Sequence, residues 1–175
     1  MKKTLLLLTL FTIPLLLSAQ YFKSQPLYAG YWGGKTTLKI STIDSSYHLE
    51  IKALSKRLKG TQFRIKPVQI NGENYQIVRT QDVIHIKDES EETVLMTSNH
   101  QMQVVMADGE TFHKNKFRRR NFTYLNESGE VVIEARLRDN VFNHVVEITM
   151  HENEPLLLAL CVEMLTRLAR EQVWL

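Results

Sequence analysis

The stretch PLLLALCVEMLTRLAR at residues 155–170 decides the fold that we expect for this chain. It begins within the tripeptide Asn-Glu-Pro at residues 153–155, which is typical of a helix start because Asn caps, Glu favours the first turn and Pro is tolerated there. Residues 156–162 are all apolar, so the first two turns offer no polar face. A helix that is apolar all round must be buried all round. We therefore predict a helix over residues 154–170 whose first half is enclosed by the rest of the protein.

The later turns of this predicted helix are mixed, because Glu163, Thr166 and two arginines gather on one side of it. We expect this second half to emerge into solvent. A membrane tail anchor would need about twice the apolar length, and a helix lying on a membrane would need a polar face throughout. Burying one Leu stabilises a protein by about 1.5–3 kcal/mol, which favours a core helix. The residues predicted to form the core helix are Leu156, Leu157, Leu158, Leu160, Cys161, Val162 and Leu165.

Upstream of the helix, apolar and polar residues alternate from about residue 35 to residue 150. Residues 47–53 and 131–137 are clear examples of this period of two. Successive side chains of a strand point to opposite faces, so each segment has one apolar face and one wet face. The pattern predicts antiparallel sheet that covers a core on one side.

Turn residues separate these segments. Asn71-Gly72 and Asp108-Gly109 predict two-residue hairpins, in which both turn positions have positive φ, and residues 126–129 predict a longer turn. The runs between breaks predict eleven or twelve short strands, which favours a closed barrel or a sandwich. The strands are expected to centre near Tyr28, Leu38, Leu49, Ile65, Ile77, Ile84, Leu95, Val104, Phe112, Phe122, Ile133 and Ile148.

Two stretches resemble the tubby C-terminal-like superfamily, which includes the LURP-one-related proteins and the phospholipid scramblases. Residues 122–135, FTYLNESGEVVIEA, are similar to a late hairpin of that superfamily, and residues 154–162, EPLLLALCV, are similar to the start of its closing helix. The resemblance implies an all-β fold in which a closed antiparallel barrel of about twelve strands surrounds an apolar C-terminal α-helix. It also implies binding and membrane-linked roles, and it implies no catalytic residue.

The first 19 residues predict a cleavable secretory signal peptide. Two lysines precede an apolar run of about fourteen residues, and Ser18 and Ala19 supply the small residues of a cleavage site. An uncleaved membrane anchor would need about 20 apolar residues, whereas this run is shorter and contains Pro14. No cysteine follows the run, which disfavours a lipoprotein. The signal resembles the bacterial type, so we expect a periplasmic or extracellular protein with a single domain over residues 20–175.

Removing the signal lowers the formal net charge from +3 to +1, because 20 basic residues then face 19 acidic ones. This near balance predicts no nucleic-acid partner. The single cysteine, Cys161, cannot form an internal disulfide. Its apolar surroundings predict a small buried residue, with a reactive or dimer-forming thiol as the alternative.

The strongest local charge lies in residues 113–120, HKNKFRRR. Alternate basic residues in this segment share one face if it is a single strand, and they cluster near one rim if it turns. Such a patch can bind phosphate headgroups, because Arg makes forked contacts and Lys supplies point charges. The alternative is a solvated hairpin that nearby glutamates balance. The candidate residues for binding lipid or another anion are Lys114, Lys116, Arg118, Arg119 and Arg120.

No motif in the chain predicts catalysis. The sequence contains no G-x-S-x-G, P-loop or G-x-G-x-x-G pattern, and its six histidines lack the spacing of a metal site. We therefore expect a non-catalytic envelope protein, with no cofactor and no metal, that binds an anionic membrane surface or another polyanion. The alternatives are a lipocalin-like carrier of a small apolar ligand, with the helix packed outside the barrel, and a structural protein that binds a protein partner.

Overall fold

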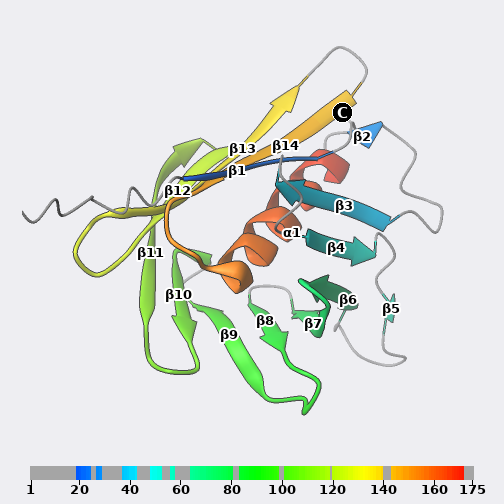
Figure 1. The fold of residues 1–175 in the computed structure, drawn as a ribbon, viewed down its shortest axis with the longest axis vertical. Coiled ribbons are helices and arrows are strands. Elements are labelled where there is room, and N and C mark those ends of the chain that lie inside the picture. Colours follow the sequence, from blue (N-terminus) through cyan, green and yellow to red (C-terminus); the bar gives the residue numbers. More distant parts are fainter. Residues whose placement is uncertain are drawn as a thin grey trace, which may run out of the picture.

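The computed structural model describes residues 19–24, 27–28, 37–42, 48–52, 56–57, 64–80, 83–98, 101–118, 120–139 and 143–171. Of the predicted signal peptide only Ala19 falls within these ranges, so that prediction lies outside the described residues. The described chain is an antiparallel β-sheet protein with one C-terminal helix (Figure 1). The predicted all-β class is therefore confirmed.

The strands are short, and each of the twelve predicted strand centres lies within one of them. The first strand, which starts at Gln20, and a two-residue strand at Lys56–Arg57 were not predicted. The helix α1 spans Pro155–Glu171, one residue later at each end than predicted. The strands are β1 Gln20–Ser24, β2 Leu27–Tyr28, β3 Thr37–Thr42, β4 His48–Lys52, β5 Lys56–Arg57, β6 Arg64–Ile70, β7 Glu73–Arg79, β8 Ile84–Lys87, β9 Thr93–Ser98, β10 Gln103–Met106, β11 Thr111–Arg118, β12 Asn121–Leu125, β13 Val131–Asp139 and β14 Asn143–Met150.

The strands follow one another through the sheet nearly in chain order. Hydrogen bonds connect them as β1-β3-β4-β6-β7-β8-β9-β10-β11-β12-β13-β14-β2, and β5 pairs with β6. The first strand also pairs with the last long one: Phe22 lies opposite Thr42 of β3 on one side and opposite Ile148 of β14 on the other. The first and the last strand of the chain therefore share backbone hydrogen bonds.

The hairpin turns follow local sequence, with one correction. Asn71 and Gly72 have φ values of 49° and 94° and connect β6 directly to β7, which confirms that two-residue hairpin. The hairpin predicted at Asp108-Gly109 forms between β10 and β11, but its predicted two-residue loop is wrong. There the loop spans residues 107–110, Gly109 alone has positive φ, and its N–H donates to the carbonyl of Met106. The longer turn at residues 126–129 is confirmed, and Gly129 donates to Asn126 in the same way.

Helix α1 lies among the strands, and they surround it in Figure 1. It packs against β13 and β14 and also against β6 and β8, which lie far from them in the strand order. Every residue from 157 to 166 is buried, so this part of the helix has no solvent face. The apolar first half is thus enclosed, in agreement with its sequence. An open lumen with the helix outside, which the carrier hypothesis requires, does not agree with this burial.

The second half of α1 differs from the prediction. Glu163 and Thr166 were expected on a wet side, but they are only 5% and 2% exposed. The hydroxyl of Thr166 donates to the carbonyl of Glu163, 3.1 Å away, which satisfies it without solvent. The burial of Glu163 requires a partner for its carboxylate, because an unpaired buried charge is very costly.

Candidate functional site

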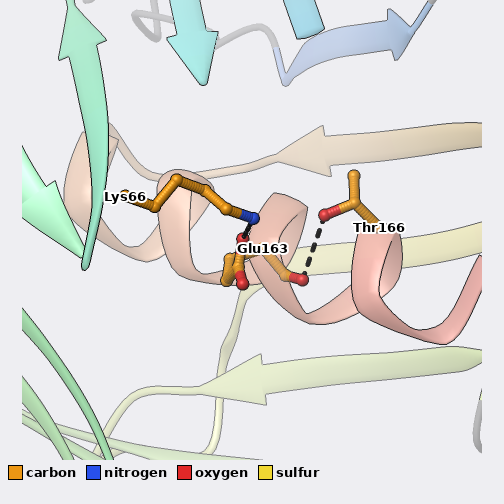
Figure 2. Close-up of polar contacts among 3 residues, drawn as sticks. All are labelled: Lys66, Glu163 and Thr166. Atoms are coloured by element: carbon orange, nitrogen blue, oxygen red, sulfur yellow. Dashed lines mark hydrogen bonds and ion pairs between the residues drawn. The ribbon is translucent and has the colours of Figure 1, made fainter. Parts of the chain in front are cut away.

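The partner of Glu163 is Lys66, which reaches α1 from strand β6 (Figure 2). The Lys66 ammonium donates to the Glu163 carboxylate, and the two side chains are 4% and 7% exposed. Burying the two charges costs free energy because both lose their hydration. Their mutual attraction offsets this cost only if the contact geometry is good, which matters less at a surface. The contact joins residues far apart in the chain and fixes the position of α1 relative to β6.

The alternation of apolar and polar residues in β6 could have predicted that Lys66 is buried. Lys66, Val68 and Ile70 are all buried, whereas the residues between them are partly or fully exposed. Lys66 therefore points to the inner face of β6 with its apolar neighbours. A lysine on the apolar face of a strand predicts a buried acidic partner, although not which one.

A cavity of about 230 Å³ lies beside this pair, at the C-terminal half of α1. We call it the basic cavity. Three cations and one carboxylate line it, and that carboxylate is Glu163, which already pairs with Lys66. Apolar side chains supply the rest of the wall, together with one amide. The lining residues are Arg79, Ile84, Gln101, Lys114, Phe122, Glu163, Met164, Arg167 and Leu168.

Lys114 is the basic residue of the cavity that the sequence had singled out, and it points inward. It is half-buried and lies opposite buried Tyr124, and its Nζ lies 4.3 Å from the centre of the Phe122 ring. A cation over an aromatic face is attracted by the ring quadrupole. Burial lowers the pKa of the Lys114 ammonium below its ordinary value. Within the described chain, Lys114 forms no ion pair.

The other basic candidates are not brought together with Lys114 by strand alternation. The register of β11 and β12 shifts between Asn115 and Phe117, so the shared-face argument for Lys114, Lys116 and Arg118 does not hold. The side chains of residues 116–119 lie outside the described part of the chain. Arg120 is exposed beyond the end of β11, and its backbone carbonyl accepts a hydrogen bond from Leu137.

Tyr124 does not line the basic cavity itself, but it contacts three residues that do, and the buried Cys161 belongs to the same helix as Met164. The Tyr124 hydroxyl donates to the carbonyl of Gln101, 3.2 Å away, and lies 3.6 Å from the sulfur of Met164. Its ring meets Phe122 edge to face at 5.9 Å between ring centres. Cys161 is fully buried, and burial raises the pKa of its thiol, which keeps it protonated and unreactive. Cys161 therefore offers no nucleophile next to the basic cavity.

Of the remaining residues predicted for the core helix, Leu157, Leu158, Leu160, Val162 and Leu165 are fully buried, and Leu156 is partly buried against the same core. No group of three or more His, Cys, Asp or Glu side chains in the described residues could hold a metal ion. No described helix has the length and hydrophobicity needed to cross a membrane.

At the N-terminal end of α1, Glu154 lies in an acidic environment. Its carbonyl accepts the hydrogen bond of Leu158 at 3.0 Å, so it is the residue that caps the helix. Burial raises the pKa of the Glu154 carboxyl to about 7, and the charges of Glu110, Glu152 and Asp108 act in the same direction. Folding therefore disfavours the ionised form of this group.

The raised pKa of Glu154 predicts a pH-dependent stability. Its ordinary value is 4.5, so the ionised group destabilises the fold above pH 7, and this cost is relieved as the pH falls from 7 towards 4.5. We expect Glu154→Gln to stabilise the protein at pH 8 by about 1–2 kcal/mol, after allowance for solvent screening and for the favourable helix N-terminus. Urea denaturation at pH 8 and pH 5 measures the difference, which should shrink at pH 5. The exposed Glu92→Gln is the control, and an equal effect of both variants would contradict the expectation.

These features define a class of protein: an antiparallel β-sheet protein with an enclosed C-terminal helix and a basic, partly apolar cavity at one end of that helix. Comparison with models of known protein families, with curated proteins and with solved structures found no match.

Proposed function

We propose that this chain is an exported, non-catalytic envelope protein of tubby-like fold that binds anionic lipid headgroups or another polyanion. The proposed fold is a closed barrel of about twelve strands around α1. Two observations support it: β1 pairs with both β3 and β14, and twelve of the strands have four or more residues while β2 and β5 have two. The proposed export rests on the signal pattern of residues 1–19.

The observation that carries the proposed anion binding is the position of Lys114 in the basic cavity. The same strand, β11, also carries Lys116 and Arg118 of the basic segment 116–120, so the cavity and part of that segment belong to one hairpin. Each basic residue near an anionic membrane contributes about 1 kcal/mol. Several of them acting together give a binding energy that salt weakens.

Sedimentation with lipid vesicles tests this role. We expect the protein to sediment with vesicles that contain phosphatidylglycerol at about 0.01 M salt and to be released from them near 1 M salt. It should not sediment with vesicles of pure phosphatidylcholine. The variant Lys116→Gln/Arg118→Gln/Arg119→Gln should lose about a hundredfold in affinity, at about 1 kcal/mol for each charge.

The matched control removes the same charge elsewhere. Lys23→Gln/Lys87→Gln/Arg136→Gln lies on other strands and should bind acidic vesicles nearly as well as the parent protein. If the protein stays in the supernatant with acidic vesicles at low salt, the membrane role is lost. A protein that binds partners and no lipid would then be the better hypothesis.

A further inference from the structure

The basic cavity is lined by both cationic and apolar side chains. Its lining includes three cationic side chains and several apolar side chains that belong to the core. Ile84, Phe122 and Met164 are 1%, 3% and 7% exposed, so their contact with the cavity is continuous with the protein interior. A ligand for such a space has one anionic end and one apolar end.

The charges of the cavity favour an anion. Of the described lining residues, only Glu163 is acidic, and its carboxylate is paired with Lys66, which is not among the lining residues. Lys114 has an aromatic face and no carboxylate as its described partner. A ligand carboxylate or phosphate would give its ammonium a charge-assisted hydrogen bond, which is about twice as strong as a neutral one. Arg79 and Arg167 also line the cavity, from β7 and α1, and each of them already takes part in another contact.

The size of the cavity limits the ligand. Pockets for drug-sized ligands measure about 300–1,000 Å³, and this cavity measures about 230 Å³. Helix α1 fills the space beyond it, because residues 157–166 are buried among the strands. The cavity therefore has room for an acidic head and a short apolar chain, and a diacyl lipid cannot enter as a whole.

We propose that the basic cavity binds a monomeric acidic amphiphile, with its carboxylate or phosphate at Lys114 and its first carbons against Ile84, Phe122 and Met164. This inference rests on the proposed anion-binding role and names its ligand class. The shared chemistry is a compact anionic head on a short alkyl chain, which a fatty acid or an alkyl phosphate supplies equally well.

Calorimetry with four probes tests the inference on the purified protein. Octanoate and octyl phosphate are expected to bind, and octanol and inorganic phosphate are expected to bind at least tenfold more weakly. If octanol binds as well as octanoate, the acidic head is irrelevant and the inference fails. If inorganic phosphate binds as well as octyl phosphate, the apolar wall is irrelevant and the inference fails equally. Absence of binding by both amphiphiles also overturns it.

Variants locate the site. Lys114→Met keeps much of the side-chain length and removes the charge, so it should weaken octanoate binding at least tenfold, whereas Lys114→Arg should retain most of it. Lys23→Met is the matched control on the exposed face of β1 and should not change the affinity. Equal binding by Lys114→Met and the parent protein would overturn the proposal.

A measurement on the unmodified protein covers the case in which Lys114→Met does not fold. Backbone NMR shifts on adding octanoate should concentrate around Ile84, Lys114 and Met164, and shifts confined to Tyr21 and Thr149 at the outer face would refute the site. Acidic vesicles separate the two proposals. If vesicles bind the protein and octanoate does not, the cavity inference fails alone. If octanoate binds and vesicles do not, the membrane role fails and the cavity site stands.

Discussion

Replacing Lys66 with methionine is expected to destabilise the protein by about 3–5 kcal/mol, because the substitution leaves the Glu163 carboxylate buried without its counter-charge. A whole domain is stable by about 5–15 kcal/mol, so this single change removes a large part of the total. Urea denaturation followed by circular dichroism gives the free energy of unfolding. Lys23→Met, which removes an exposed ammonium, should change it by less than about 0.5 kcal/mol.

The double variant Lys66→Met/Glu163→Leu distinguishes a buried charge pair from lost packing. Apolar residues of similar volume often replace a buried ion pair with no loss of stability, so the double variant should be more stable than Lys66→Met alone. The double-mutant cycle isolates the coupling between the two side chains. A cost below about 1 kcal/mol for Lys66→Met, or a double variant that is the less stable of the two, would contradict a strong buried pair.

Placing a charge in the middle of α1 is expected to prevent folding altogether. Leu158 is fully buried, so Leu158→Asp loses about 1.5–3 kcal/mol of apolar transfer energy and also buries an unpaired carboxylate at several kcal/mol more. The sum is comparable to the stability of a whole domain. The measurement is the presence of a cooperative unfolding transition and of dispersed amide signals in an NMR spectrum.

Two control variants distinguish the effect of burying a charge from the effects of changing residue 158 and of adding a charge elsewhere. Leu158→Met conserves volume and should cost less than about 1.5 kcal/mol. Met102→Asp introduces the same charge at a side chain that is 46% exposed and should change stability by no more than about 0.5 kcal/mol. A folded Leu158→Asp protein with native-like stability would mean that α1 is dispensable for the core.

Local patterns predicted the strands and the helix because both depend on short-range periodicity. The apolar run of residues 156–162 could only be buried, and the alternation of the middle of the chain could only form sheet. The strand β1 was missed because its five residues follow the predicted signal peptide and show little contrast between apolar and polar positions. Its pairing with β14 depends on the arrangement of the whole sheet.

The residues that line the basic cavity or lie next to it were harder to predict, because their positions depend on contacts between distant parts of the chain. Lys66 and Glu163 are 97 positions apart, and no local pattern connects them. Lys114 was predicted to belong to one basic patch with residues 116–120, on a shared face if the segment is a single strand or near one rim if it turns. The register of β11 shifts after Asn115, which the single-strand case did not include, and such an irregularity arises from the fit of one hairpin within the sheet.

The pairing of Gln20 in β1 with Met150 in β14 has a consequence for how the protein is made. A ribosome adds about 5–20 residues per second, so roughly 7–30 seconds separate the synthesis of Gln20 from that of Leu165 in the helix. During this interval the early strands have neither their last neighbour nor the side chains that will cover their apolar faces. Nascent chains with unpaired apolar strands are prone to aggregate. We therefore expect the polypeptide to depend on a chaperone until its final residues have been translated.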